Sequence, residues 1–424
     1  MAPRARAKTL GRHRHSTRRP NPRPKPPKLT KDTLIEATDQ CVKCGLCLPH
    51  CPTYRLTRDE GESPRGRIAL IQALVSGALP PSQRLDAHLA RCLECRACEP
   101  VCPSLVAVGA IMDQARARRT QALPAWRRWI TRAWLSALAS PQLLRQAERL
   151  AALGRATGLD RAARGLGLVR LPRLYAYARL GEGLYPPPRW DRADHADEQV
   201  ALFLGCVAEV TQPASLSAAA LVLGRLGMSV ARPAGQGCCG AMFRHNGFPD
   251  QADTLLERNA AALSGQRLVG IASACVAELR THSGLAQTQE ICTFLATVPW
   301  PAGLALTPLP VDVLVHEPCS HRNQLGGNAD VYRLLARIPG LRVAPLPDNA
   351  WCCGAAGTYL LQHPQTAGAL LGDKLAHLAR LRPQVLVTTN PGCALHLAAG
   401  LREVGLSIEV CHPVELVARQ LPSL

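Results

Sequence analysis

The chain has 424 residues, too many for one typical core, so we expect several domains. Its formal net charge is +19, but residues 1–31 carry +11 and residues 116–192 carry +12. The remainder is slightly acidic, which argues against a nucleic-acid-binding protein. No stretch resembles a secretory signal or a transmembrane helix, so we expect a cytoplasmic protein whose 18 cysteines stay reduced.

The first cysteine-rich module follows a basic, proline-rich tail, residues 1–32, which we expect to be disordered. In this module, residues 33–114, two runs share one spacing: Cys41-x2-Cys44-x2-Cys47-x3-Cys51-Pro52 and Cys92-x2-Cys95-x2-Cys98-x3-Cys102-Pro103. This is the ligand pattern of bacterial ferredoxins, in which the fourth cysteine of each run binds the other cluster. The pattern therefore predicts two [4Fe–4S] clusters, one held by Cys41, Cys44, Cys47 and Cys102, the other by Cys51, Cys92, Cys95 and Cys98.

Structural zinc is the alternative for these eight cysteines, because zinc ribbons also use Cys-x2-Cys pairs. Zinc sites do not require four cysteines within eleven residues, twice, with a proline after each run. Iron–sulfur clusters are therefore the favoured interpretation.

An Arg-rich segment without cysteine, residues 115–197, shows helical patterning and is predicted to be a linker. One of its helical faces carries apolar side chains, namely Trp126, Trp129, Ile130, Ala133, Trp134, Ala137 and Leu138. Arginines 127, 128 and 132 lie off that face. Such a basic amphipathic helix suits peripheral contact with an anionic membrane, here the cytoplasmic face of the inner membrane. The alternative is that the tryptophan face packs against the rest of the protein.

The C-terminal half is an internal duplication, with copies at residues 198–305 and 306–424. Each copy has a single cysteine, a vicinal pair followed by Gly-Ala, and a later single cysteine: Cys206, Cys238, Cys239 and Cys275, then Cys319, Cys352, Cys353 and Cys393. Short apolar runs, expected to be buried strands, lead into the single cysteines at 200–204, 268–271, 311–315 and 385–387. Helical patterns at 251–263 and 366–380 follow the pairs. Each copy is therefore predicted to be an α/β unit with its cysteines on loops at strand ends.

The four thiols of each copy are further candidate ligands, for additional iron–sulfur clusters. The alternative is that they are ordinary buried cysteines, which suits eight duplicated positions poorly. Two more cysteines, Cys292 and Cys411, lie in strand-like segments, and we interpret them as core residues.

The sequence resembles the iron–sulfur subunit of bacterial glycolate oxidase over roughly residues 35–424. The segments that carry the resemblance are the two cysteine runs, 63–68, 205–206, 237–240, 316–319, 352–359, 390–393 and 412–416. The duplicated half resembles the cysteine-rich CCG domains also found in heterodisulfide reductases, lactate-utilisation proteins and a glycerol-3-phosphate dehydrogenase subunit. The fullest CCG pattern ends in Cys-x2-Cys, but here Ala272 and Asn390 replace the earlier cysteine. This departure favours glycolate oxidase over heterodisulfide reductase.

The resemblance implies an α-helical dicluster ferredoxin-like module followed by a duplicated α/β cysteine-rich domain. It implies an electron-transfer subunit of a complex that oxidises glycolate or a similar 2-hydroxy acid. No Gly-x-Gly-x-x-Gly fingerprint follows a strand, so we expect a flavin-containing partner to oxidise the substrate, and a quinone or another carrier to receive the electrons. The alternatives are the equivalent subunit of another dehydrogenase and a thiol-redox protein.

Overall fold

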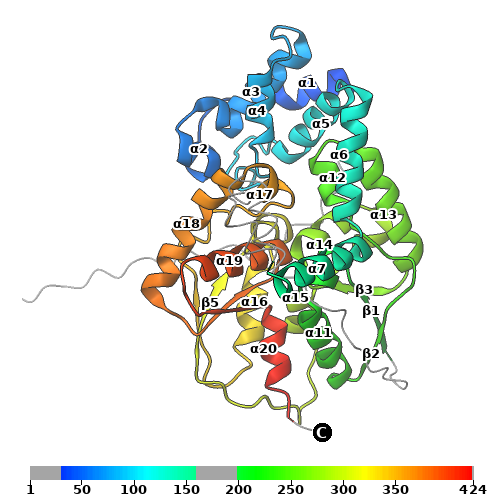
Figure 1. Cartoon of the computed structure of the whole chain (residues 1–424), viewed down its shortest axis with the longest axis vertical. Coiled ribbons are helices and arrows are strands. Elements are labelled where there is room, and N and C mark those ends of the chain that lie inside the picture. Colours follow the sequence, from blue (N-terminus) through cyan, green and yellow to red (C-terminus); the bar gives the residue numbers. More distant parts are fainter. Residues whose placement is uncertain (1–29, 159–197, 423–424) are drawn as a thin grey trace, which may run out of the picture.

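The computed structural model describes residues 30–158 and 198–422, so the basic tail up to residue 29 and the linker from residue 159 to 197 lie outside the described residues. A helical module stands at one end of the molecule, and two α/β units lie side by side below it (Figure 1). Within the described ranges, no helix is both long and apolar enough to cross a membrane.

The N-terminal module is all-helical, as predicted. Its elements are α1 (Lys31–Asp39), η1 (Leu48–His50), α2 (Pro52–Thr57), η2 (Glu60–Glu62), α3 (Pro64–Ser76), α4 (Gln83–Ala90) and α5 (Val108–Gln121). The hydroxyl groups of Thr30, Ser63 and Ser82 accept hydrogen bonds from backbone N–H groups and so cap the N-termini of α1, α3 and α4. Leu34 and Ile71 are fully buried between these helices. Helix α5 runs across the predicted domain boundary at residue 114.

Two further helices, α6 (Ala125–Leu138) and α7 (Pro141–Ala156), form the described part of the Arg-rich segment. The inner side of α6 packs on the first α/β unit, where Leu135 is fully buried against Phe243 and Ala252. Trp134 and Leu138 also pack against the apolar core of the second unit. The predicted tryptophan face is therefore divided, because its C-terminal part contacts the core whereas Trp126 and Trp129 are exposed.

The first α/β unit is built on a parallel sheet in the order β2-β1-β3-β4. The strands are β1 (Glu198–Phe203), β2 (Met228–Ala231), β3 (Arg267–Gly270) and β4 (Gln289–Glu290). The helices are α10 (Val207–Thr211), α11 (Pro213–Arg225), α12 (Ala241–His245), α13 (Pro249–Leu263), α14 (Ser273–Leu279), η4 (Ser283–Leu285) and α15 (Ile291–Thr297).

The second unit repeats this topology with the order β6-β5-β7-β8. The strands are β5 (Asp312–His316), β6 (Arg342–Pro345), β7 (Val385–Thr388) and β8 (Glu409–Cys411). The helices are η5 (His321–Leu325), α16 (Asn328–Leu335), α17 (Tyr359–Gln362), α18 (Pro364–Leu381), α19 (Pro391–Glu403) and α20 (Pro413–Arg419). The predicted fold class, a helical module followed by a duplicated α/β unit, is confirmed.

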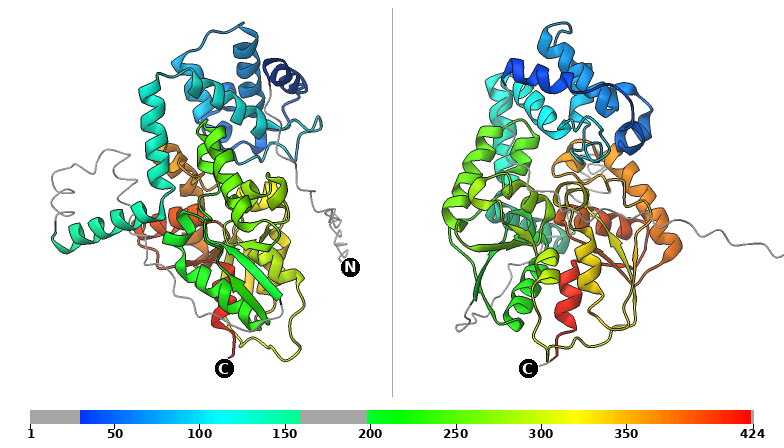
Figure 2. Two further views of the ribbon diagram at one scale, coloured as in Figure 1. Left: turned by 90° about the vertical axis from the view of Figure 1, so that its right-hand side faces the viewer. Right: turned by 180° about the vertical axis from the view of Figure 1, so that it is seen from behind.

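The two α/β units share one hydrophobic core. Val200 and Leu216 of the first unit belong to the same buried cluster as Val313 and Val414 of the second. Polar groups also join the units, since the hydroxyl groups of Ser273 and Ser320 lie 2.8 Å apart. Figure 2 shows the sheets packed as neighbours, with the helical module above both.

The helical module contacts both α/β units. Its second cysteine loop, which carries Cys95, lies against the second unit. The side-chain amide of Asn323 donates a hydrogen bond to the carbonyl oxygen of Cys95, over 2.8 Å. Arg55 of α2 forms an ion pair with Asp373 of α18. On the other side, Arg116 of α5 donates to the carbonyl oxygen of His245 in the first unit.

Candidate metal centres

The first cavity of the helical module is lined by the thiols of Cys51, Cys92, Cys95 and Cys98. These are the four cysteines that the ferredoxin pattern groups around one cluster. Burial raises the pKa of the Cys92 thiol to about 11, so a thiolate at this position requires a compensating positive charge, which the iron of a bound cluster would supply.

The second cavity is lined by Cys41, Cys44, Cys47 and Cys102, which are the other predicted set, together with Cys98 at its edge. Two residues of each cysteine run have positive φ at matched positions, namely Lys43 and Gly45 in the first run and Glu94 and Arg96 in the second. Alternation of right- and left-handed backbone conformations turns successive N–H groups to one side and forms a concavity suited to an anion. An anionic cluster bound by thiolates fits both cavities, and the ligand assignment itself stays a prediction.

A buried ion pair supports the first cavity, and no pattern in the sequence assigned it a role. The Arg67 guanidinium lies 2.6 Å from the Glu62 carboxylate, and both side chains are almost fully buried. The same guanidinium reaches within 4.0 Å of Cys51 Sγ, and His88 Nδ1 lies 2.8 Å from Glu62. Arg67 lies within the segment 63–68 that carries the family resemblance, but only the fold shows that its charge faces a cluster ligand.

In the first CCG copy, hydrogen bonds join Cys238 to Cys206 and to Cys239, and Cys239 to Cys275. Cys206 follows β1, the vicinal pair Cys238–Cys239 lies in the loop after β2, and Cys275 stands in the first turn of α14. Hydrogen bonds from Cys206 and Cys239 hold the pKa of the Cys238 thiol well below its usual value. Asn259 fixes this loop, since its side chain accepts the N–H of Gly237 and donates to the carbonyl oxygen of Cys238.

In the second copy, the equivalent thiols form two close pairs. Cys353 Sγ lies 3.3 Å from Cys393 Sγ, and Cys319 Sγ lies 4.0 Å from Cys352 Sγ. The hydrogen bond to Cys352, together with burial, raises the pKa of the Cys319 thiol well above its usual value. The predicted loop placement is wrong for Cys275 and Cys393, because Cys393 also lies in the first turn of a helix, α19. The strands before these two cysteines end five residues before the thiols, and the helices begin three residues after the strands end.

Two basic side chains distinguish the second copy from the first. His316 stands three residues before Cys319, where the first copy has Phe203. Lys374 corresponds to Asn259, because Gly354 approaches Ala367 as Gly240 approaches Ala252. Lys374 is 1% exposed, and burial lowers the pKa of its ammonium group to about 8. Sequence comparison of the copies detects both differences, but not their location beside the thiols.

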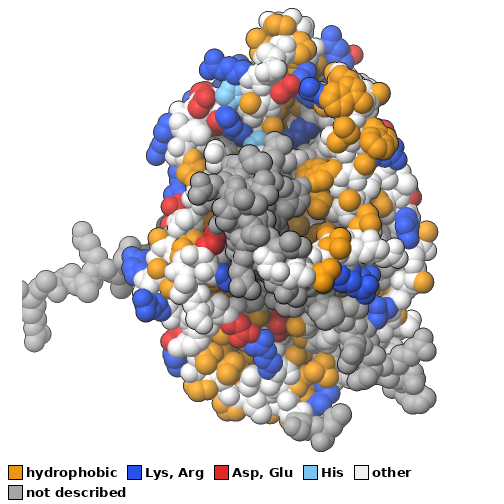
Figure 3. Space-filling view, in the orientation of Figure 1, with side chains coloured by type: hydrophobic (Ala, Val, Ile, Leu, Met, Phe, Trp, Pro, Cys, Tyr) orange, Lys and Arg blue, Asp and Glu red, His pale blue; other side chains and the backbone are white. Residues whose placement is uncertain are grey.

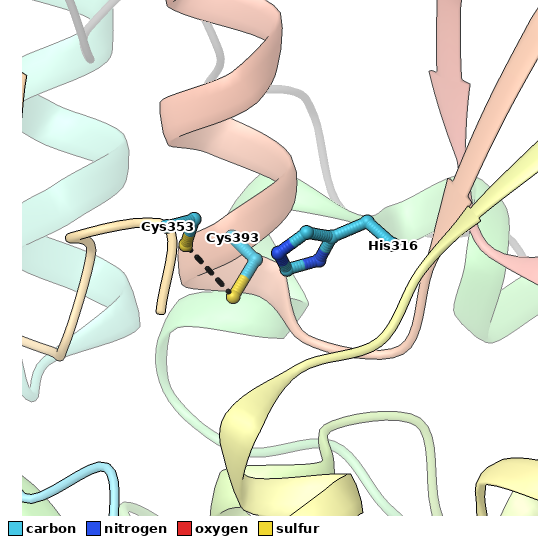
Figure 4. Close-up of side chains that lie close together, drawn as sticks. All are labelled: His316, Cys353 and Cys393. Carbon is cyan, nitrogen blue, oxygen red and sulfur yellow. Dashed lines mark hydrogen bonds between the residues drawn. The ribbon is translucent and has the colours of Figure 1, made fainter. Parts of the chain in front are cut away.

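The His316 ring points toward the thiols of Cys353 and Cys393 (Figure 4). Its Nδ1 atom lies 3.0 Å from the Thr388 hydroxyl, and burial lowers the pKa of the imidazole to about 3, so the ring is neutral. Cys292 and Cys411 belong to the buried cluster of the shared core, and the Cys292 thiol also lies beside the buried side chains of Glu290 and His412. Cys411 ends β8, but Cys292 lies in α15 rather than in a strand.

The two kinds of cysteine site differ in the space that they leave. A [4Fe–4S] cluster places four iron and four sulfide ions between its ligands. The thiols of the helical module surround cavities and therefore fit such a cluster. In the second CCG copy the thiols lie closer together, with Cys353 Sγ 3.3 Å from Cys393 Sγ and Cys319 Sγ 4.0 Å from Cys352 Sγ, and further iron–sulfur clusters in the CCG copies stay a prediction.

Comparison with known proteins separates the same two regions of the chain. The model of the 4Fe-4S dicluster domain matches residues 37–106, and that of the CCG cysteine-rich domain matches residues 200–280 and 313–398. The probable glycolate oxidase iron-sulfur subunit of Bacillus subtilis is 30% identical over 404 residues, 87% of this chain and 90% of the relative. The glycolate oxidase iron-sulfur subunit of Escherichia coli K12 is 30% identical over 419 residues, 93% of this chain and 96% of the relative. A subunit of the anaerobic glycerol-3-phosphate dehydrogenase of E. coli K12 is 28% identical over 418 residues, 92% of this chain and 99% of the relative.

Proposed function

The chain belongs to the family of glycolate oxidase iron–sulfur subunits, and from this membership we propose that it transfers electrons within a complex that oxidises glycolate or a similar 2-hydroxy acid to the 2-oxo acid. The observation that carries the proposal is the pair of cavities, each lined by four of the eight ferredoxin-type cysteines. A [4Fe–4S] cluster bound there accepts and releases one electron at a time.

The protein's own residues determine how an electron donor reaches the two sites. Cys44 is exposed, whereas Cys51 is buried and the loop around Cys95 is covered by the second CCG copy. We infer that the cavity lined by Cys44 is the one that a partner protein approaches. Oxidation of a hydroxy acid requires a hydride acceptor such as a flavin, so this partner is proposed to be a flavin-containing dehydrogenase subunit.

An apolar collar of exposed side chains, Val42, Leu46 and Leu105, surrounds the exposed cavity. Val42 and Leu46 line the cavity with Cys44, and Leu105 follows Cys102 by three residues. Leu105 is 77% exposed. Large apolar side chains clustered around an accessible redox site are typical of a docking surface, because desolvation of such residues drives association. The collar is therefore proposed as the contact with the flavin subunit.

The N-terminal half of α6 is a second exposed apolar surface. Trp126, Trp129, Ile130 and Ala133 are exposed at helical spacing, and Arg127 lies over the Trp126 ring at 5.1 Å. Figure 3 shows hydrophobic side chains gathered over this helix. We propose that this stripe gives peripheral contact with an anionic membrane surface, where a quinone acceptor is available.

Anaerobic purification of the full chain tests the main proposal. We expect broad visible absorbance, about eight iron atoms per chain and paramagnetic resonance signals from two interacting reduced clusters. We also expect reduction of the protein by hydroxy acid only when the flavin subunit is added. A colourless protein that contains zinc and no iron contradicts the proposal.

A further inference from the structure

The two cavities of the helical module each receive one arginine from the same short segment of α3. Arg67 lines the covered cavity, which contains Cys51 and Cys95, and Arg65 lines the exposed cavity, which contains Cys44. Residues two positions apart on a helix do not face each other, so the two guanidinium groups point to different cavities. The segment therefore supplies one positive charge to each site.

The two arginines differ in their access to water. The side chain of Arg65 is 31% exposed, and it pairs over 2.7 Å with Glu60, whose side chain is 50% exposed. Water and salt screen such a charge. The side chain of Arg67 is 1% exposed. Because the surroundings of Arg67 have a low dielectric constant, its charge acts on the covered cavity with little screening.

Hydrogen bonds hold the Arg67 guanidinium in one orientation. Its Nε–H group donates to the carbonyl oxygen of His88 over 2.8 Å, and Nη1 donates to the Thr53 hydroxyl over 3.1 Å. Nη2 lies 2.6 Å from the Glu62 carboxylate. The remaining neighbour is a cluster ligand, since Nη1 lies 4.0 Å from Cys51 Sγ. The positive charge is therefore fixed against the thiols before any electron arrives.

The charges around Arg67 do not cancel. Glu62 pairs with Arg67 and also with Arg91, whose Nη1 lies 3.0 Å from the same carboxylate. One carboxylate between two guanidinium groups leaves a net charge of +1, and Arg67 is the member of the group that lines the cavity.

Two more charged side chains line the covered cavity, but each is paired with an opposite charge. Glu94 lies 3.1 Å from Arg116, and Arg96 lies 3.7 Å from Asp113. Arg67 therefore provides the excess positive charge beside the buried thiols.

Burial by itself makes a cluster a poorer electron acceptor, because desolvation disfavours added negative charge. An electron that enters beside Cys44 would then stay in the exposed cavity. We propose that Arg67 raises the reduction potential at the covered cavity above that at the exposed cavity, so that electrons move inward from the partner's side. One electron leaves the site beside Cys44 and arrives at the site beside Cys51, with no bond broken and no proton moved. This inference rests on the proposed function, since it requires a cluster in each cavity.

A redox titration of the anaerobically purified full chain, followed by electron paramagnetic resonance, tests the inference. Cys95→Ala removes a ligand of the covered cavity, so the midpoint potential that remains in this variant belongs to the exposed one. In the wild type, we expect the covered cavity to have the more positive midpoint potential.

Variants of the ion pair should shift the midpoint potential of the covered cavity in opposite directions. Arg67→Met should lower the ratio of reduced to oxidised cluster at a fixed potential about tenfold, which is 59 mV for one electron. Glu62→Gln keeps the guanidinium but removes its counter-charge, so it should raise this ratio. A merely structural role of the pair does not give shifts of opposite sign.

Matched variants separate charge from packing. Arg67→Lys keeps the positive charge and should retain most of the wild-type potential. Arg65→Gln should alter the potential of its own cavity much less than Arg67→Met does, because water screens Arg65. If Arg67→Met loses iron, the double variant Arg67→Met/Glu62→Gln removes the pair without leaving a buried charge. Its midpoint potential should lie below that of Glu62→Gln alone.

Three outcomes overturn the inference. They are a covered cavity with the more negative midpoint potential in the wild type, a Glu62→Gln variant whose potential does not rise, and a double variant with the same potential as Glu62→Gln. Each is observed only when both clusters are present. Absence of iron, or no reduction by hydroxy acid when the flavin subunit is added, counts against the proposed function instead.

Discussion

The helical module and the CCG copies each present cysteines in sets of four, but they arrange them differently. In the helical module, short loops that each contain two residues with positive φ carry the thiols around cavities. In the CCG copies, loops and helix starts that are distant in the sequence bring the thiols together, and in the second copy they form two close pairs. The number of thiols is therefore not sufficient to predict the occupant. The backbone around the thiols determines how far apart they lie.

The largest expected effect distinguishes the two regions directly. Cys95→Ala removes a ligand from the first cavity, so the chain should lose about four iron atoms and its electron transfer. Cys275→Ala also removes one thiol, from the first CCG copy, and should leave the iron count near eight. Iron analysis and paramagnetic resonance of both variants check this. Equal iron loss in the two variants contradicts the division between cavities and contact sites.

The polar interactions that hold the cysteine loops should also contribute differently to the free energy of unfolding in the two regions. Glu62→Ala leaves Arg67 as an unpaired buried charge, and breaking such a pair costs about 3–5 kcal/mol. Asn259→Ala removes hydrogen bonds of a neutral amide to the Cys238 loop and should cost about 1–3 kcal/mol.

Urea denaturation under anaerobic conditions, followed by circular dichroism, measures both losses. The conservative variant Glu62→Gln is the matched control, since it keeps the shape and a hydrogen-bond acceptor but removes the charge. If the free energy of unfolding of Glu62→Ala is not lower than that of Asn259→Ala, the buried ion pair does not stabilise the protein to the expected extent.

Much of this architecture could be predicted from the sequence, for identifiable reasons. The x2-x2-x3 spacing is local, so it fixes which thiols share a loop, and the structure brings the predicted sets together. The duplication predicted two α/β units because a short apolar run precedes each single cysteine in both copies.

What the sequence did not reveal depends on contacts between distant segments. Residues 67 and 62 are charged, and only the fold shows that they are buried together. The approach of Asn323 to Cys95 joins segments more than two hundred residues apart. The division of the α6 tryptophans likewise depends on Phe243, which no local pattern places against that helix.

A third prediction compares the exposed cavity with the covered one. Leu105→Glu places a charge in the collar and should weaken binding of the flavin subunit about 10- to 100-fold, because collar residues lose water on docking. The cluster signals should persist, since Leu105 provides no thiol. Leu221→Glu, a change at an exposed leucine on α11, is the control and should have no effect. Surface plasmon resonance measures this binding. If Leu105→Glu binds the flavin subunit with unchanged affinity, the collar has no docking role.

The smallest expected effect concerns α6, where one helix presents an exposed stripe and a packed one. Trp129 is 70% exposed, so Trp129→Ala should leave stability almost unchanged but weaken binding to anionic liposomes about fivefold, or about 1 kcal/mol. Trp134 packs against the core of the second CCG copy, so Trp134→Ala should lower stability and barely alter liposome binding at a temperature where the protein is folded.

Because arginines 127 and 132 contribute electrostatic attraction, high salt should reduce binding of the wild-type chain. Co-sedimentation at low and high salt, with cluster absorbance as the readout, measures these differences. A wild-type chain that stays in the supernatant at low salt shows that the exposed stripe does not bind membranes, and its apolar side chains then require another partner.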